Sequence, residues 1–154
     1  MWDREELFRS AIIAKARDWL GTPWKHQHRL KGVGVDCVGL IIAAGVEANV
    51  LKEPGDAFHP WRGYSRTPNP NRMRAGLEHF LQAIPEGAQP RPGDVAWIAW
   101  PEAPDMPMHL AIYAWRQGGP SLIHSSERVD RVVEHGFTGE WPSLVNSWWR
   151  YPGL

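Results

Sequence analysis

The chain has 154 residues with 17 basic and 17 acidic side chains, so its formal net charge is zero, and it holds one cysteine. This balance argues against a protein that binds nucleic acid through a basic face, and one cysteine cannot form an internal disulfide. No apolar run reaches the roughly 18 residues of a membrane span, and the charged start MWDREELFRS lacks the apolar core of a secretory signal, so we expect one domain over residues 1–154, made in the cytoplasm.

Two helices are predicted in the first third of the chain. Asp3 and Glu6 have the spacing of a capping box, and apolar residues at helical spacing follow until Gly21, which can end the helix. Residues 37–48 are apolar nearly all round, which is typical of a buried helix. Asp36 has a suitable side chain to cap that second helix.

A third helix is predicted to start at the cap Asn69, with Pro70 at its first position, and to end before Pro85. Its apolar stripe is Met73, Leu77, Phe80, Leu81 and Ile84. The period then changes from helical spacing to alternation, which predicts strands at residues 93–100, 108–115, 121–126, 131–135 and 146–151. Helices followed by strands favour an α+β fold with an antiparallel sheet.

The only cysteine, Cys37, begins the predicted buried helix directly after the loop GTPWKHQHRLKGVGV. Backbone N–H groups and the positive end of the helix dipole stabilise a thiolate there, so we expect a pKa well below the free value of about 8.5 and rapid alkylation at neutral pH. The charge of Asp36 opposes this unless its carboxylate caps the helix or binds a substrate amine. The alternative is a small buried apolar residue. A nucleophilic role needs a nearby base, most often histidine.

Two histidines lie on neighbouring predicted strands. His109 begins one strand and His124 ends "SLIH" on the next. If the turn is centred on residues 116–117 they are directly opposite, and if it is centred on 117–118 they are diagonal neighbours on one face. A turn centred on 118–119 leaves them on one face but too far apart for a hydrogen bond.

The remaining histidines and the ten tryptophans give weaker signals. His26 and His28 form "HQH", but no further ligand pair has recognisable spacing, so no metal site is predicted and the loop is expected to face solvent or substrate. Most tryptophans are expected in the core, with the loop residues Trp24 and Trp61 as candidates to line a groove. Three histidines are expected at the surface: His59, His79 and His135.

In this order, the segments GTPWKHQHRLKGVGVDCVGLI, RPGDVAWI, MHLAIY and SLIHSS resemble the NlpC-type cell-wall peptidases, which are papain-like cysteine peptidases. The resemblance implies a papain-like α+β core, in which the cysteine helix packs on an antiparallel sheet that bears the histidines. It implies cleavage of peptidoglycan stem peptides, typically between D-glutamate and diaminopimelate, without a cofactor. Cys37 would be the nucleophile, His109 the general base and His124 the residue that orients it. N–H groups at the start of the cysteine helix would hold the oxyanion.

Two positions depart from the family pattern. Val38 stands where most members have Ser, and Trp24 stands where many have Tyr. Together with Asp36, these positions help to hold the free amine of the stem peptide in the family. The resemblance therefore implies Asp36 and Trp24 as substrate-binding residues.

The loop KGVGVDC and the segment GYSRTPNPNRM resemble most the subgroup carried by tailed phages and gene transfer agents. This implies tail-hub or tail-tip proteins as partners and a tail particle that acts on the cell wall. Two alternatives stay open. One is an N-acetylmuramoyl-L-alanine amidase with the same site, and the other is a non-catalytic plug or binding module of a tail hub.

Overall fold

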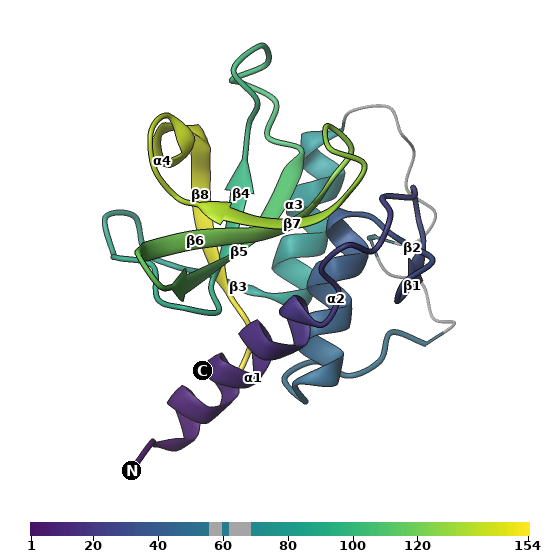
Figure 1. Cartoon of the computed structure of the whole chain (residues 1–154). Coiled ribbons are helices and arrows are strands. Elements are labelled where there is room, and N and C mark those ends of the chain that lie inside the picture. Colours follow the sequence, from purple (N-terminus) through teal and green to yellow (C-terminus); the bar gives the residue numbers. More distant parts are fainter. Residues whose placement is uncertain (56–59, 62–68) are drawn as a thin grey trace.

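The structure is a computed structural model that describes residues 1–55, 60–61 and 69–154 (Figure 1). Three helices, α1 (Arg4–Arg17), α2 (Cys37–Glu47) and α3 (Pro70–Phe80), precede most of the strands. The predicted α+β class is confirmed, because the apolar sides of these helices and one face of an antiparallel sheet form a single core. Among the described residues, no helix has the length and apolar character to cross a membrane.

Capping side chains fix where the first two helices begin. The Asp3 carboxylate accepts from the Glu6 backbone N–H at 2.8 Å, and the Glu6 carboxylate accepts from the Asp3 N–H at 2.9 Å, so the predicted capping box is present. Helix α1 ends at Arg17, before Gly21, which follows in a turn with φ 84°. At α2, the Asp36 carboxylate accepts from the Gly39 N–H at 2.8 Å.

The third helix is shorter than predicted. Asn69 caps it as expected, by accepting from the Arg72 N–H, but the helix ends at Phe80 and Leu81 is already extended. The next two residues form strand β3 (Gln82–Ala83), which pairs with the last strand, and the Ile84 N–H donates to the Trp148 carbonyl. The prediction that the helix includes Ile84 is therefore wrong. The backbone of residues 82–84 forms its hydrogen bonds with strand β8 and not within a helix.

The main sheet has six strands in the order β3-β8-β4-β5-β6-β7, and each neighbouring pair is antiparallel. Its five longer strands match the predicted ones within a few residues: β4 (Val95–Ile98), β5 (His109–Arg116), β6 (Gly119–Ser126), β7 (Arg131–Gly136) and β8 (Val145–Arg150). Four short elements were not predicted: strands β1 (Arg29–Leu30) and β2 (Gly34–Val35), which pair with each other, strand β3, and helix α4 (Trp141–Leu144). In Figure 1, α4 lies beside β8 at the upper left and both chain ends lie at the lower left.

The two faces of the sheet pack against different layers. Side chains such as Leu110 and Ile112 of β5 belong to the core under the helices. The alternate residues, Ala111 and Tyr113, belong to a smaller apolar cluster on the other face, which α4 and the segment before it cover. This alternation places His109 on the α4 side of the sheet.

Asp94, at the turn before β4, ties three parts of the chain together. Its carboxylate is fully buried and accepts from the Arg9 guanidinium of α1 at 2.9 Å and from the Arg150 guanidinium of β8 at 2.9 and 3.0 Å. The Arg91 backbone N–H donates to it at 2.7 Å. A buried carboxylate with this many donors is costly to disturb, because loss of either charge leaves the other uncompensated.

One predicted groove residue is a core residue. Trp61 is 3% exposed, stacks on Phe80 with ring centroids 5.1 Å apart, and donates to the Met73 carbonyl. The prediction that it lines a groove is therefore wrong. His59 and residues 63–68 of the segment GYSRTPNPNRM lie outside the described residues.

Candidate active site

Cys37 is the first residue of α2, where the sequence places it, and it is half-buried. Asp36 holds the helix start by accepting from the third N–H of the helix, that of Gly39. The N–H groups of Cys37 and Val38 are directed to the thiol, where they favour its charged form. This is the arrangement that the position of the cysteine predicts.

The upstream loop crosses directly over this helix start. The Gln27 N–H donates to the second oxygen of Asp36 at 2.7 Å, and a Cβ added to Gly39 would lie only 2.7 Å from the His28 carbonyl oxygen. A side chain at residue 39 would therefore push the loop away. The half-buried Trp24 lies in the same loop and bridges to Val35, just before the capping aspartate.

The thiol itself is shielded from water. It lies against the backbone N–H of Leu110, the residue that follows His109. Burial, and then the charge of Asp36, raise the pKa of the Cys37 thiol to about 12, and this outweighs the lowering by the nearby N–H groups. The predicted low pKa is therefore wrong for this conformation, because burial of the thiol beside strand β5 removes the water that would stabilise a thiolate.

The β5–β6 hairpin brings two histidines together. Ile112 pairs with Ile123 and Arg116 with Gly119, so residues 117–118 form the turn and the histidines are diagonal neighbours. Both glycines at the turn have positive φ, 100° at Gly118 and 130° at Gly119, which suits a tight hairpin. The second of the three predicted registers is the one found.

The two imidazoles of this hairpin are in direct contact. The His109 Nε2 lies 2.6 Å from the His124 Nδ1, and the side chains are only 6% and 2% exposed. Burial and the nearby His135 lower the pKa of His109 to about 3, and burial lowers the pKa of His124 as well. Both rings are therefore neutral at pH 7, which is the form that can accept a proton from a thiol.

A third histidine joins the pair. The His124 Nε2 lies 2.8 Å from the His135 Nε2, and the His135 Nδ1 lies 2.9 Å from the Gly136 carbonyl oxygen. His135 is half-buried, so its predicted place at the surface, without a partner, is wrong. The β6–β7 register pairs His124 with Val133, which makes His135 its diagonal neighbour on the same face. The sequence predicts both strands but not the turn between them, which decides this contact.

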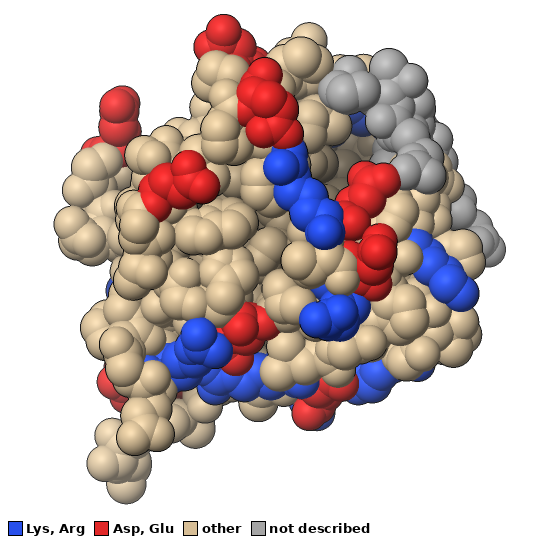
Figure 2. All heavy atoms as spheres, turned by 45° about the horizontal axis from the view of Figure 1, so that its top comes forward, with Lys and Arg blue, Asp and Glu red and all other residues tan. Residues whose placement is uncertain are grey.

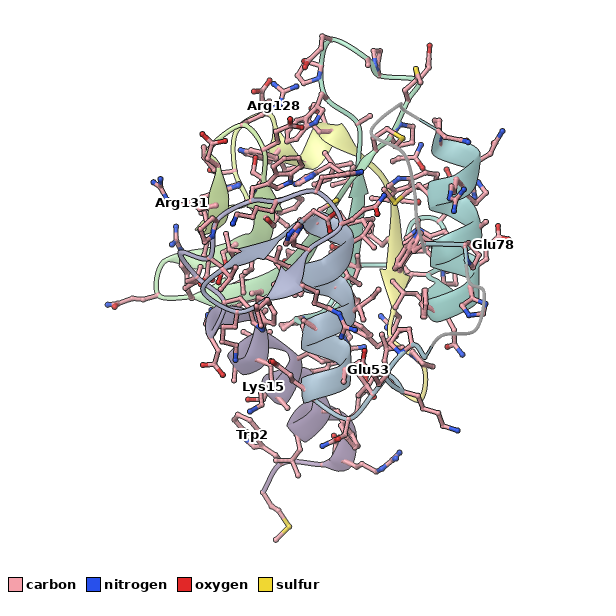
Figure 3. All side chains as sticks on the ribbon, turned by 90° about the vertical axis from the view of Figure 1, so that its right-hand side faces the viewer. Trp2, Lys15, Glu53, Glu78, Arg128 and Arg131 are labelled. Atoms are coloured by element: carbon pink, nitrogen blue, oxygen red, sulfur yellow. The ribbon has the colours of Figure 1, made fainter. Side chains whose placement is uncertain are left out.

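Aromatic side chains cover the three rings. Trp100 stacks on His109 with ring centroids 4.9 Å apart, and Trp141 of α4 lies 4.5 Å from His135. The Arg128 guanidinium stacks on Trp100 at 4.0 Å, and Figure 3 shows Arg128 at the upper end of the molecule. The cover shields His109 and His124 from water, which is why burial is the main cause of the lowered pKa of these two rings.

Figure 2 shows acidic side chains at the upper end of the molecule and basic side chains lower down, beside further acidic ones, on a mostly uncharged surface. His26 and His28 lie in the loop beside the site, half-buried and exposed respectively. Among the described residues, no three potential ligands gather in a way that could hold a metal ion.

Comparisons with known proteins identify the fold. No protein-family model matches the chain and no curated protein matches its sequence. Solved structures do match, each at under 25% identity, so the likeness shows the fold alone. An NlpC/P60 family protein from Bacillus cereus has a TM-score of 0.63 and 18% identity, and the match covers 93% of this chain and 40% of that protein. This chain thus spans well under half the length of that protein.

Two further structures match with TM-scores of 0.58. The peptidoglycan hydrolase RipB of Mycobacterium tuberculosis is 17% identical, over 97% of this chain and 67% of that one. An N-acetylmuramoyl-L-alanine amidase of Bacteroides uniformis is 12% identical, over 93% of this chain and 96% of that one. The chain therefore has the papain-like NlpC/P60 fold, as the sequence resemblance implied.

Proposed function

We propose that this chain is a cysteine peptidase that hydrolyses the stem peptides of peptidoglycan. Cys37 is the nucleophile, His109 takes the thiol proton, and His124 orients His109. The observation that carries the proposal is the meeting of a helix-start thiol with the strand that begins at His109, whose ring contacts His124. Solved structures of the same fold include a named peptidoglycan hydrolase.

The site supports a general-base mechanism. With the pKa of the thiol near 12 and that of His109 near 3, the resting pair is neutral. The proton moves from sulfur to imidazole as sulfur attacks the scissile carbonyl, and the imidazolium then protonates the leaving amine. The N–H groups of Cys37 and Val38 donate to the oxyanion that forms.

The bond between D-glutamate and diaminopimelate is our proposed cleavage site. Asp36 and Trp24 are the proposed contacts to the free amine of the stem peptide. Support comes from their places beside the thiol, since Asp36 precedes it and the Trp24 loop crosses the helix start. The buried negative charge of Asp36 favours a cationic group at that edge of the site.

Digestion of purified peptidoglycan, followed by mass analysis of the fragments, tests both the reaction and the bond. An endopeptidase of the proposed kind releases fragments with a new amino terminus at diaminopimelate. Cys37→Ser should abolish release, and His79→Ala, a change at an exposed position of α3, should leave it at the wild-type rate. Equal release by the wild type and Cys37→Ser would end the proposal.

The amidase of the same fold favours one second candidate. An amidase would use the same three residues but would release whole stem peptides and leave sugar strands without them. The same mass analysis separates the two reactions. If neither product forms with the intact site, the chain is a non-catalytic binding module.

We also propose that the protein acts as part of a phage-like tail, with tail-hub or tail-tip proteins as partners. This rests on the likeness of the loop KGVGVDC and the segment GYSRTPNPNRM to the tail-borne subgroup. Co-purification with assembled particles tests it. Peptidoglycan cleavage by free protein that never enters particles would contradict the tail role and leave the enzymatic one standing.

A further inference from the structure

We infer that His135, together with the Gly136 carbonyl, is a positioning residue that sets the tautomer of the proposed base His109 through His124. The three rings and the carbonyl form one line of contacts at 2.6, 2.8 and 2.9 Å. The carbonyl stands at the end of the line, and it is the one member that can only accept a hydrogen bond.

The carbonyl gives this line a direction. Because it cannot donate, the His135 Nδ1 must carry the hydrogen in their 2.9 Å contact. In its neutral form His135 has one N–H, and the contact with the carbonyl places it on Nδ1, so the His135 Nε2 is then an acceptor and the His124 Nε2 donates to it. The His124 Nδ1 then accepts from the His109 Nε2.

This direction leaves the lone pair of His109 on Nδ1. That atom is the ring nitrogen closer to the His109 backbone, and the Cys37 thiol lies at the backbone N–H of the next residue, Leu110. With the opposite direction, Nδ1 would carry a hydrogen and could not take the thiol proton. The His135 Nδ1 lone pair would then face the lone pairs of the Gly136 carbonyl.

The surroundings keep the line intact. His109 and His124 are almost fully buried, which favours neutral rings with one hydrogen each. Trp100 stacks on His109, and Trp141 lies against both His124 and His135, so the ring planes are held by packing. A fixed direction is valuable here because His109 and His124 are shielded from the water that could supply a missing donor.

Long-range ¹H–¹⁵N correlation spectra of histidine-labelled protein test the inference without any need for activity. In the wild type we expect the Nε2–H tautomer for His109 and His124 and the Nδ1–H tautomer for His135. His135→Phe removes the acceptor and keeps a ring against Trp141, and should give mixed tautomers at the other two rings. His135→Gln, whose amide can accept and donate, should restore the Nε2–H form, and the exposed His79→Phe serves as the matched control.

A second test, by enzyme kinetics, rests on the proposed function, whereas the spectra do not. His135→Phe should lower kcat about tenfold at unchanged KM, and His135→Gln should recover most of that loss. A wild-type His135 with Nε2–H, or an unchanged His109 spectrum in folded His135→Phe, would overturn the inference. If His135→Phe does not fold, the wild-type and His135→Gln spectra still decide it. Failure of the proposed function alone would show as the expected spectra in a protein that cleaves no peptidoglycan.

Discussion

Two buried, neutral histidines should make the protein unusually sensitive to mild acid. His109 and His124 are 6% and 2% exposed, and burial lowers the pKa of each below the ordinary value of about 6.5. A depressed folded-state pKa means that the unfolded chain binds more protons. The stability that these rings contribute is therefore complete above pH 6.5 and is lost as the pH falls toward the folded values.

The size of the effect follows from the linkage relation. Each histidine that stays neutral in the fold lowers the free energy of unfolding by about 1.4 kcal/mol per pH unit below 6.5. Two such rings therefore cost about 5 kcal/mol between pH 7.5 and pH 4.5, which is a large part of a typical stability of about 5 to 15 kcal/mol. Glu53 and Glu134, whose pKa values are lowered, lose their contribution only below about pH 4.5, outside this window.

Urea unfolding followed by tryptophan fluorescence at pH 7.5, 6.5, 5.5 and 4.5 measures this loss. The double variant His109→Gln/His124→Gln is the control, because its amides do not titrate. We expect a steep fall for the wild type and a nearly flat profile for the double variant. Equal slopes for the two proteins would refute the reasoning, since the proton uptake would then come from elsewhere.

Four further results are expected. Iodoacetamide should label Cys37 slowly at pH 7 and faster as the pH rises toward 12, and rapid labelling at pH 7 in the folded protein would contradict the raised pKa of its thiol. His109→Ala should slow peptidoglycan cleavage by about 10³ to 10⁴-fold and His124→Gln by about tenfold, and equal, total losses in two folded variants would make His124 a direct participant. Gly39→Ala should lower the melting temperature and increase proteolysis of the loop over α2, because its Cβ would meet a loop carbonyl, and an unchanged melting temperature would argue against that close approach. Asp94→Ala should cost about 3 to 5 kcal/mol in urea unfolding, and a loss under 1 kcal/mol would mean that its two arginines find water instead.

Local patterns predict the parts of this fold that depend on neighbours in sequence. Asp3 and Asp36 are recognisable as caps because a capping side chain reaches only two or three residues ahead. The strands on either side of residues 117–118 alternate clearly, so the contact between His109 and His124 is one of a few registers that the sequence allows. The position of Cys37 at a helix start is fixed in the same local way.

Other properties depend on what lies across the core. The high pKa of the Cys37 thiol comes from burial that includes the strand at Leu110, more than 70 residues later in the chain. Trp61 sits in a proline-rich segment, so the sequence does not show that it packs on Phe80. The contact between His135 and His124 depends on the register of β6 and β7. That register depends on the length of the turn between the strands, which the sequence there does not determine. These are the places where tertiary contacts override local preference.

The tight turn at residues 117–118 also limits how this chain can change length during evolution. His109 and His124 touch because the β5–β6 pairing brings both to one face, and side chains alternate along a strand. If one residue is inserted between Ile112 and Arg116 and the pairing shifts by one, His124 turns toward the helices. If two are inserted, His124 stays on its own face but pairs two residues further along β5. The tip of the hairpin can lengthen freely if the pairing below it is kept. We therefore expect insertions in homologous chains to gather at the tip and to be rare or paired within the two strands.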